Sequence, residues 1–443
     1  MKRYPAYKDS GVEWIGKIPE GWEIRRLRYI SKSVKTGTTP PSENLEYYDE
    51  GNIDWYTPGD FGESLELLSS SKKITVLAIK NRVARIFEKG TILLVGIGAT
   101  LGKIALMHKQ ASLNQQINAI VLDERFIPKF YAYYLNSIKD IIISLSNAAT
   151  LGIINQERTK QIICLVPSKN EQSTIANYLD HKTAMIDELI KKNKRLIELL
   201  KEKRQAIISH AVTKGLVPNA NMKDSGIEWI REMPEGWEVK RLKFMSLLRP
   251  SNVDKKNEVG ETEVRLCNYI DVYNNESIDD SIDFMVASAT SDEIKKFRIL
   301  RGDVLITKDS EEWNDIAVPS FVNGTLNTVL CGYHLALVRP KTEMIDGKYL
   351  FWSFQSYNIN IQFRVSANGI TRYGLSKNSI SSAFFLVPPI SEQQTIANFL
   401  DQKTAKIDGT IQKILSQIEK LKEYRQALIS NVVTGKVSVA GQL

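Results

Sequence analysis

Three short polar segments hold side chains of the kinds that read DNA bases. Residues 114–116 read NQQ, and asparagine and glutamine can each make two hydrogen bonds to adenine in the major groove. Residues 369–377 read GITRYGLSK, in which arginine suits guanine and lysine suits phosphate. Residues 307–315 read TKDSEEWND, whose carboxylates can accept from cytosine amino groups. Residues 114–116 can equally be a turn that satisfies its own backbone, and residues 307–315 can be a solvated turn.

The candidate DNA-binding residues are polar or basic side chains on these segments and on loops near residues 38 and 100. They are Thr38, Thr39, Thr100, Lys103, Asn114, Gln115, Gln116, Lys308, Ser310, Thr371, Arg372, Tyr373 and Lys377.

The segment VGIGATLGK, residues 95–103, resembles a phosphate-binding loop in its glycine content but lacks the residues that such a loop requires. A Walker loop needs glycine five residues before its Gly-Lys pair and serine or threonine after it, and here those positions hold Ile97 and Ile104. The four histidines are scattered without an HExxH pair, and the three cysteines form no CxxC pair. We therefore expect no catalytic residue, disulfide framework or metal site in this chain.

Composition favours a globular protein with a polyanionic partner. The 443 residues are 43% hydrophobic and 25% charged, with a formal net charge of +8 and a pI near 9.0. A basic balance of this size fits nucleic acid, although a solvated basic surface gives the same number. No apolar run has the length of a membrane span, and the N-terminus has no secretory signal, so a cytoplasmic protein of two or three domains is expected.

Two repeated segments must position the candidate side chains. DSGVEWIGKIPEGWEIRRL at residues 9–27 recurs as DSGIEWIREMPEGWEVKRL at 224–242. A second segment starts with EQSTIAN at Glu171 and returns as EQQTIAN at Glu392. The stretches between, about 31–170 and 246–391, are alike in length but differ over most of their course. Such an order predicts one scaffold used twice, with two different surfaces.

The second repeated segment predicts a long helix. Residues 183–211 contain no glycine or proline, and apolar side chains recur at alternating steps of four and three, which is a heptad seam. About 29 residues at roughly 1.5 Å each give a rod of roughly 43 Å, the length of about a dozen base pairs. The seam residues expected to pair the two helices are Ile190, Asn193, Ile197, Leu200, Arg204, Ile411, Ile414, Ile418, Leu421 and Arg425.

Polar side chains interrupt this seam at three places. Asn193 either fixes the register of the pair or lies at a solvated end. Arg204 and Arg425 occupy equivalent positions, so each is expected to face an acidic side chain or a carbonyl. We expect an α+β fold in which two mixed α/β domains are joined by two long helices that pair as an antiparallel coiled coil, with a pseudo-twofold internal repeat.

With this order of segments, the chain closely resembles the specificity (S) subunit of type I restriction-modification systems over essentially its whole length. The motifs that carry the resemblance are EWIGKIPEGWE and EWIREMPEGWE, WYTPGDF, GATLGK with NQQ, GDVLITKDSE, CGYHLALVRP, and the helices ending in KEKRQAIIS and KEYRQALIS. The implied segments are a first target recognition domain at 1–170, a long helix at 171–217, a second recognition domain at 218–391 and a second long helix at 392–443.

The resemblance implies a non-catalytic reader of double-stranded DNA. Each recognition domain reads one half of a bipartite asymmetric site, and the helices set the spacer and dock two methyltransferase subunits. Those partners carry S-adenosylmethionine and methylate adenine at N6, and two restriction subunits that use ATP and Mg²⁺ complete the enzyme. It further implies a prokaryotic cytoplasmic protein at the nucleoid. The resemblance implies that Trp14, Trp22, Trp229 and Trp237 anchor the frame on which the two partners dock, and plain core packing is the alternative that we expect for them.

Other functions remain open from the sequence. Absence of DNA binding would favour a tandem scaffold that binds only protein, or an inactive, orphan specificity subunit. Methylation by the isolated chain would favour a self-sufficient methyltransferase or nuclease, against which the missing cofactor and metal motifs count.

Overall fold

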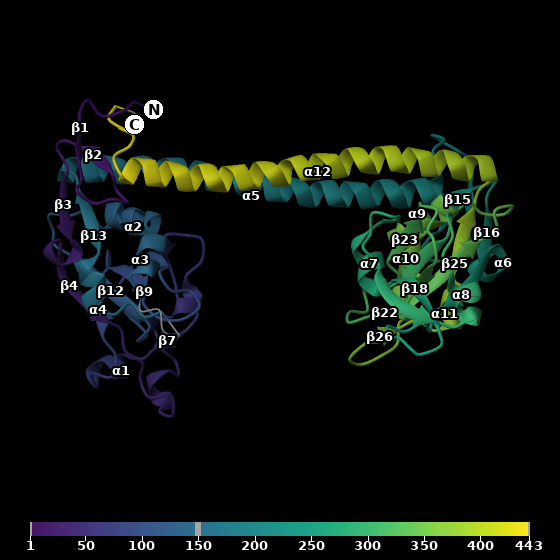
Figure 1. The fold of residues 1–443 in the computed structure, drawn as a ribbon, viewed down its shortest axis with the longest axis horizontal. Helices are drawn as coiled ribbons and strands as arrows, with labels where there is room; N and C mark the ends of the chain where they lie inside the picture. Colours follow the sequence, from purple (N-terminus) through teal and green to yellow (C-terminus); the bar gives the residue numbers. More distant parts are fainter. Residues whose placement is uncertain (1, 147–151, 442–443) are drawn as a thin grey trace. The chain divides into compact units, whose positions relative to one another are not determined.

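The computed structural model describes residues 2–146 and 152–441, which divide into two compact units (Figure 1). The first unit comprises Met1–Asn193 and Ser416–Leu443, and the second comprises Lys194–Leu415. Each unit therefore combines one mixed domain with part of each long helix, whereas the sequence suggested four consecutive segments. Within the described ranges, no helix is long and apolar enough to cross a membrane.

The first unit is built on two mixed sheets. One has the strand order β4-β12-β9-β10-β6, with bounds Ser31–Thr36, Ile117–Leu122, Ile92–Val95, Ile104–Met107 and Glu66–Leu67. The other has the order β7-β5-β11-β8, with bounds Lys73–Ile74, Ile53–Tyr56, Ala111–Leu113 and Ile86–Phe87. Two further pairs are the hairpin of β1 (Tyr7–Asp9) and β2 (Lys17–Pro19), and β3 (Glu23–Arg26) with β13 (Ile163–Val166). The short helices are η1 (Leu27–Tyr29), η2 (Leu45–Tyr47), η3 (Pro58–Asp60), α1 (Val76–Lys80), α2 (Pro128–Ser137), α3 (Lys139–Ser144) and α4 (Gln156–Gln161).

The second unit repeats this plan. Its main sheet has the order β17-β25-β21-β23-β19, with bounds Ser246–Pro250, Leu335–Pro340, Val304–Thr307, Pro319–Val322 and Ser277–Ile278. A smaller sheet has the order β20-β18-β24, with bounds Met285–Ala289, Thr262–Cys267 and Val329–Cys331. The pairs are β14 (Met222–Asp224) with β15 (Glu232–Pro234), β16 (Glu238–Arg241) with β27 (Phe384–Val387), and β22 (Asp309–Ser310) with β26 (Tyr373–Gly374). The helices are α6 (Leu242–Met245), α7 (Tyr269–Asn274), α8 (Ser291–Phe297), α9 (Gly347–Gln355), α10 (Tyr357–Ser366) and α11 (Lys377–Ser382).

The main sheets of the two units share one topology although their sequences diverge. In each, the edge strand pairs in parallel (β6 with β10, β19 with β23) while the neighbouring pairs are antiparallel. The strands are apolar and fully buried, as β9 and β21 illustrate, because helices cover one face and a second sheet packs nearby. The expectation of one scaffold with two surfaces is thus confirmed.

Matched side-chain contacts tie each domain to its long helix. Gln172 and Gln393 are buried, and each donates a hydrogen bond of 2.8 Å to a proline carbonyl just before the helix, that of Pro167 and that of Pro388. The ion pairs that link the neighbouring helix to the long helix also recur, as Lys129–Asp180 (2.7 Å) and Lys348–Asp401 (2.5 Å). The repeated sequence therefore encodes the same joint twice.

The tryptophans of the repeated phrase divide into two kinds. Trp22 and Trp237 are each 1% exposed and pack in the core as expected, whereas Trp14 and Trp229 are 38% and 40% exposed, so core packing was the wrong prediction for them. The physical reason is their place in the turn of a two-stranded hairpin, where only one face of the chain meets the domain.

The two buried tryptophans differ in hydrogen bonding. Trp237 Nε1 donates to Glu392 Oε2 at 3.1 Å. The equivalent glutamate, Glu171, instead accepts from the Tyr4 hydroxyl at 2.6 Å, and among the described atoms Trp22 Nε1 has no acceptor. Burial and this glutamate raise the pKa of Tyr4.

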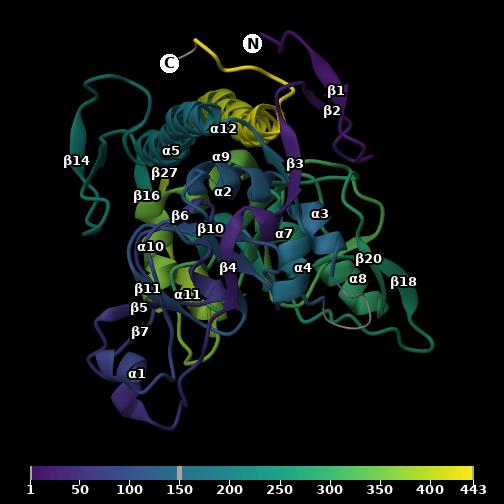
Figure 2. The ribbon, with the colours of Figure 1, turned by 90° about the vertical axis from the view of Figure 1, so that its left-hand side faces the viewer.

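The long helices α5 (Lys169–Lys214) and α12 (Ile390–Val433) each begin two residues before the segments expected at 171–217 and 392–443 and end before those segments end, and they lie side by side (Figures 1 and 2). In the first unit Arg425 Nε donates to Asp187 Oδ1 at 2.9 Å. In the second unit Arg204 forms an ion pair with Asp408 at 3.0 Å. In the repeat, Asp187 corresponds to Asp408 and Arg204 to Arg425, so each helix gives the aspartate to one pair and the arginine to the other. The acidic partner expected for each arginine is thus confirmed.

The apolar seam residues are buried along both helices. Ile190 and Ile418 in the first unit, and Ile197, Ile411 and Ile414 in the second, are each at most 9% exposed, while Leu200 and Leu421 are partly buried. Since the stripe has heptad spacing and opposed ion pairs flank it, the helices run antiparallel with the apolar side chains between them.

Asn193 is buried in this seam, with 9% exposure, and its Nδ2 has no hydrogen-bond partner among the described atoms. We expect Asn193→Ile to stabilise the chain by about 1–3 kcal/mol, because the substitution removes an unsatisfied buried donor and fills the seam. Differential scanning calorimetry measures the change. The reverse variant at the equivalent position, Ile414→Asn, is the control and should destabilise; a lower melting temperature for Asn193→Ile would contradict the seam assignment.

Candidate DNA interface

In the first unit, the candidate loops after β9 and after β11 lie against each other. Gly96 N donates to the Gln116 carbonyl at 2.7 Å, and Ile97 pairs with Ile153 in an isolated bridge. A Cβ at Gly96 would stand 2.6 Å from the Ile154 carbonyl, so only glycine allows this approach. Gly96 therefore serves a close backbone packing, and Gly98 and Gly102 supply the positive φ angles of the loop.

Two of the candidate side chains on these loops are used within the protein. Lys103 Nζ donates to the Phe61 carbonyl at 2.7 Å, which ties its loop to η3. Asn114 is 8% exposed; its Oδ1 accepts from Gln116 N at 2.9 Å and its Nδ2 donates to Gln116 Oε1 at 3.0 Å. For Asn114 the geometry therefore favours the turn explanation. Gln115 is exposed, and Gln116 and Thr100 are partly buried.

Thr38 and Thr39 lie in the loop that follows β4. Thr38 is anchored, because its carbonyl accepts from Trp55 Nε1 at 3.0 Å and its Oγ1 accepts from Arg85 N at 3.2 Å. Thr39 is exposed. A DNA contact by either residue remains a prediction.

A group of basic residues near Thr38 was missed by sequence reasoning. The small core of Tyr47, Trp55, Ile74, Ala78 and Ala84 supports α1 and its flanks. Around it, five exposed basic side chains form what we call the basic strip: Lys72, Lys73, Lys80, Arg82 and Arg85. No acidic residue lies between positions 72 and 85, and that charge run is the signal that could have found the strip.

In the second unit, strand pairing joins two candidate segments that are far apart in sequence. β22 pairs with β26, with Ser310 opposite Tyr373 and Asp309 opposite Gly374. Leu375 N also donates to the Lys308 carbonyl at 2.8 Å. Residues 307–315 and 369–377 therefore form one surface, which the sequence did not predict.

The loop at 369–373 is a closed tip that presents two candidates to solvent. Asn368 and Gly374 exchange backbone hydrogen bonds of 3.1 and 2.9 Å, which closes its base. A Cβ at Gly369 would lie 1.9 Å from the Arg372 carbonyl, so glycine is required there. Thr371 and Arg372 are exposed, and so is Lys377 at the start of α11.

The side chains of Lys308 and Ser310 make contacts within the protein, beneath this surface. Lys308 Nζ donates to the Ser251 carbonyl at 3.0 Å and lies 4.7 Å from the centre of the Tyr333 ring. Ser310 is 5% exposed and accepts from Glu312 N at 3.2 Å. Ser310 is thus a buried support for the segment, whereas the Tyr333 ring beside Lys308 is half-exposed.

The residue after Tyr333 has a strained backbone conformation, and its side chain contacts β22. His334 has a φ of 73°, a region that costs about 1 kcal/mol or more for residues other than glycine. Its Nδ1 lies 2.6 Å from Asp309 Oδ2, which holds the turn against β22. The sequence showed a lone histidine here, and nothing in it marked the left-handed backbone.

Besides Asp309, a second carboxylate of the 307–315 segment contacts another side chain of the protein. Asp315 accepts a hydrogen bond of 2.5 Å from the Tyr273 hydroxyl, and this contact raises the pKa of Tyr273 to about 12. Glu311 and Glu312 are exposed. Burial raises the pKa of the neighbouring Tyr269, and the nearby Arg372 opposes that shift.

Metal binding and thiol chemistry find no candidate site among the described residues. In residues 2–146 and 152–441 no group of three or more His, Cys, Asp or Glu side chains is arranged to hold a metal ion. Cys164, Cys267 and Cys331 are all buried and free, and burial raises the pKa of each thiol.

Comparison with known proteins gives a consistent result. A family model described as the type I restriction modification DNA specificity domain matches residues 19–199 and 234–420, once in each half of the chain. The MjaIX type I restriction enzyme specificity subunit of Methanocaldococcus jannaschii is 26% identical, covering 96% of this chain and 95% of that protein. The EcoKI specificity subunit of Escherichia coli is 22% identical over 96% and 90% of the two chains.

Solved structures show the same fold. A chain from a study of the assembly and conformational transition of a type I R-M system aligns with a TM-score of 0.72 at 15% identity, over 95% of this chain and 99% of that one. The HsdS subunit from Thermoanaerobacter tengcongensis aligns with a TM-score of 0.54 at 16% identity, over 95% and 98%.

Proposed function

The chain belongs to the family of type I restriction modification DNA specificity proteins, and we propose that it reads a bipartite, asymmetric DNA site on behalf of catalytic partner subunits. Each unit reads one half-site with the loops described above. The chain itself supplies recognition and no chemistry. The observation that carries this proposal is the shared sheet topology of two units whose exposed loops differ in sequence and in charge.

The two units would contact DNA in different ways. The first presents Gln115, Thr39 and the basic strip, and the second presents Thr371 and Arg372 on a closed loop and Lys377 at the start of α11. Lysine and arginine of the strip suit phosphate, while the side chains on the loops suit base edges. Two unlike surfaces on one scaffold are what an asymmetric site requires.

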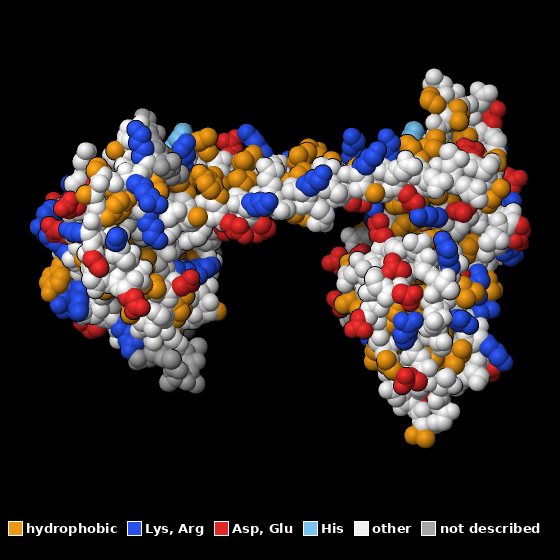
Figure 3. Space-filling model, turned by 45° about the horizontal axis from the view of Figure 1, so that its top comes forward, with side chains coloured by type: hydrophobic (Ala, Val, Ile, Leu, Met, Phe, Trp, Pro, Cys, Tyr) orange, Lys and Arg blue, Asp and Glu red, His pale blue; other side chains and the backbone are white. Residues whose placement is uncertain are grey.

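The proposed partners are two methyltransferase subunits that bring S-adenosylmethionine and methylate adenine at N6. Two restriction subunits that use ATP and Mg²⁺ complete the nuclease form. Apolar side chains exposed on α5 support docking along the helices, namely Met185 and Leu189 in the first unit and Leu196 and Leu199 in the second, each at least 40% exposed. Hydrophobic side chains at the surface of the helices are seen in Figure 3. Action on DNA places the protein in a prokaryotic cytoplasm, at the nucleoid.

Arg372 gives a sharp test of base reading. We expect Arg372→Ala to relax one position of one half-site by about 1–3 kcal/mol, because the exposed arginine sits on a rigid closed loop and would pair with guanine. Binding of the complex to duplexes that vary one base pair at a time measures this. Arg301→Ala, at an exposed arginine on the turn before β21 of the same unit, is the matched control. Equal weakening on every duplex would make Arg372 a phosphate contact.

A further inference from the structure

We propose that the hairpins β1–β2 and β14–β15 are two copies of one docking surface, and that each binds a segment of a methyltransferase subunit carrying a basic side chain beside an apolar one. This inference rests on the proposed function, since it names where the partners attach. It adds a surface outside the long helices and outside the DNA-reading loops.

The two hairpins have the same structure. In the first, Tyr7 pairs with Pro19 and Asp9 with Lys17; in the second, Met222 pairs with Pro234 and Asp224 with Glu232. Both turns are capped in the same way, because Asp9 Oδ1 accepts from Gly11 N at 2.8 Å and Asp224 Oδ1 accepts from Gly226 N at 2.9 Å. A partner would therefore meet the same backbone shape twice.

The exposed aromatic side chain is the first feature that points to a partner. Trp14 and Trp229 are 38% and 40% exposed at equivalent positions, although the other tryptophan of each phrase is buried. Half-exposed tryptophans offer a large apolar area and are enriched among the residues that dominate protein interfaces. The domain core does not need these two rings, and yet both copies of the phrase hold them.

Charge indicates the chemistry of the occupant. Exposed carboxylates gather on the hairpins at Glu13 and Glu20 in the first unit and at Glu228 and Glu235 in the second. Within the described residues none of these four glutamates has an ion-pair partner. Such a surface repels the phosphates of DNA and attracts lysine or arginine. The hairpins also hold basic side chains, but carboxylates outnumber them: Asp9, Glu13 and Glu20 against Lys8 and Lys17 in the first, and Asp224, Glu228, Glu232 and Glu235 against Lys223 and Arg231 in the second.

The presence of two similar hairpins indicates that two copies of one partner bind to the chain. The exposure of each residue from Lys8 to Trp14 matches that of Lys223 to Trp229, with a single small difference at the Val12 position. The surfaces that we assign to DNA differ between the units, as reading two half-sites demands. The stretch from Asp9 to Trp14 is nearly identical to that from Asp224 to Trp229, although the residues at 16 and 17 differ from those at 231 and 232. A stretch kept this similar in both units fits a ligand that is the same on both sides, and the paired methyltransferase subunits are such a ligand.

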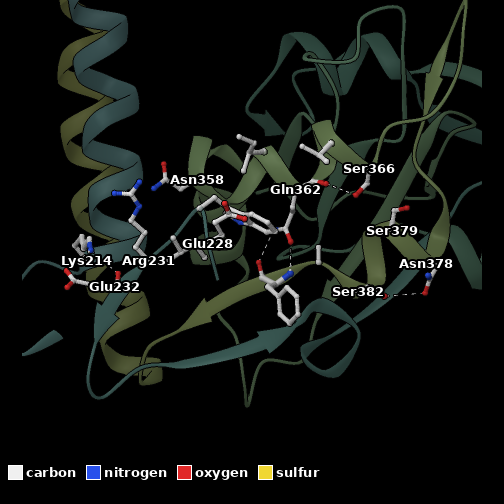
Figure 4. A pocket seen from close by; sticks show the side chains of 16 residues that line it. Lys214, Glu228, Arg231, Glu232, Asn358, Gln362, Ser366, Asn378, Ser379 and Ser382 are labelled. Carbon is white, nitrogen blue, oxygen red and sulfur yellow. Dashed lines mark hydrogen bonds and ion pairs between the residues drawn. The ribbon is translucent and has the colours of Figure 1, made fainter. Parts of the chain in front are cut away.

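In the second unit the hairpin also forms one wall of a broad groove of about 1340 Å³ (Figure 4). Trp229, Glu228 and Arg231 line it from the hairpin. The facing wall comes from α10 and α11 and consists largely of amide and hydroxyl side chains, including Gln362 and Ser382. A polypeptide segment seated on Trp229 would find apolar, charged and neutral hydrogen-bonding groups within one recess.

The test removes each tryptophan separately in the complex with methyltransferase subunits. We expect Trp14→Ser and Trp229→Ser each to weaken the binding of one methyltransferase subunit by about thirtyfold, the loss usual for an interface hot spot, and the double variant to weaken both. Native mass spectrometry over a dilution series counts the subunits per chain. Leu300→Ser, at an exposed apolar side chain on the turn before β21, outside both hairpins and the DNA-reading loops, should leave two subunits bound.

Charge reversal checks the chemistry without changing the rings. Glu13→Lys and Glu228→Lys should weaken the same subunits, and the loss should shrink at high salt because the contacts are exposed. Unchanged circular dichroism and melting temperature establish that these variants fold.

Three outcomes are informative. If the double tryptophan variant binds two subunits as the unaltered chain does, the docking inference is overturned while the proposed function stands. If the variants keep both subunits but lose DNA affinity, the hairpins contact DNA and the inference is again overturned. If the unaltered chain binds no methyltransferase subunit, the proposed function itself fails.

Discussion

Removing residues 194–197 from α5 together with 415–418 from α12 is expected to shorten the spacer of the DNA site by one or two base pairs while both half-sites stay the same. Four helical residues contribute about 6 Å of rise and leave a rotation of about 40° beyond a full turn. One base pair contributes about 3.4 Å and roughly 35°. In rotation the deletion matches one base pair and in length it approaches two, which is why we expect the spacer to shorten by one or two base pairs.

The deletion must be made in both helices at equivalent positions. The ion pairs Asp187–Arg425 and Arg204–Asp408 flank the deleted segment on its two sides, and a matched deletion leaves both pairs able to form. After a deletion in α5 alone, the two ion pairs could not both form, and the seam side chains would be out of register. This control should therefore lose stability and methylation. Methylation mapping reads the spacer directly; an unchanged spacer in the matched deletion would show that the helices do not set it.

Loss of the basic strip is expected to weaken DNA binding on every sequence. In the variant in which Lys72, Lys73, Lys80 and Arg82 are replaced by alanine, we expect affinity to fall roughly a hundredfold near physiological salt. The slope of log affinity against log salt should fall by about 0.9 for each phosphate that the variant no longer neutralises. Arg85 is left in place because it also donates to the Thr36 carbonyl within the protein. Fluorescence anisotropy across a salt series measures both quantities.

The matched control removes the same charge from the surface of α5, at Lys191, Lys194, Lys201 and Lys203, all exposed. If this control weakens DNA binding as much as the strip variant does, the effect is one of net charge and the strip is no DNA surface. A loss confined to a single base pair would instead make the strip a base-reading element.

The repeated parts of the chain were predictable because their chemistry is local. Heptad spacing marked the buried stripe of Ile190 and Ile418, and equivalence under the repeat implied the acidic partners of Arg204 and Arg425. The repeated phrase predicted the same hairpin twice. It could not separate Trp14 from Trp22, since residue type is identical and only the position in the hairpin decides which ring is covered.

The candidate site was less predictable because its contacts are long-range. The pairing of β22 with β26 joins segments some 60 residues apart. In neither segment do apolar and polar residues alternate clearly enough to predict a strand. The amide of Asn114 has the atoms to bind adenine, but the same atoms satisfy a turn, and only the backbone geometry shows which use they have. The left-handed backbone of His334 accompanies its contact with Asp309, and sequence spacing reveals neither.

The most direct test of the central claim maps N6-methyladenine across the genome of cells that express this chain with its methyltransferase subunits, against cells without the chain. We expect one bipartite motif that appears only when the chain is present, and we expect half of that motif to change when residues 31–168 are exchanged for those of another recognition domain. An active methyltransferase that leaves no chain-dependent motif would contradict the claim that this protein reads DNA for it.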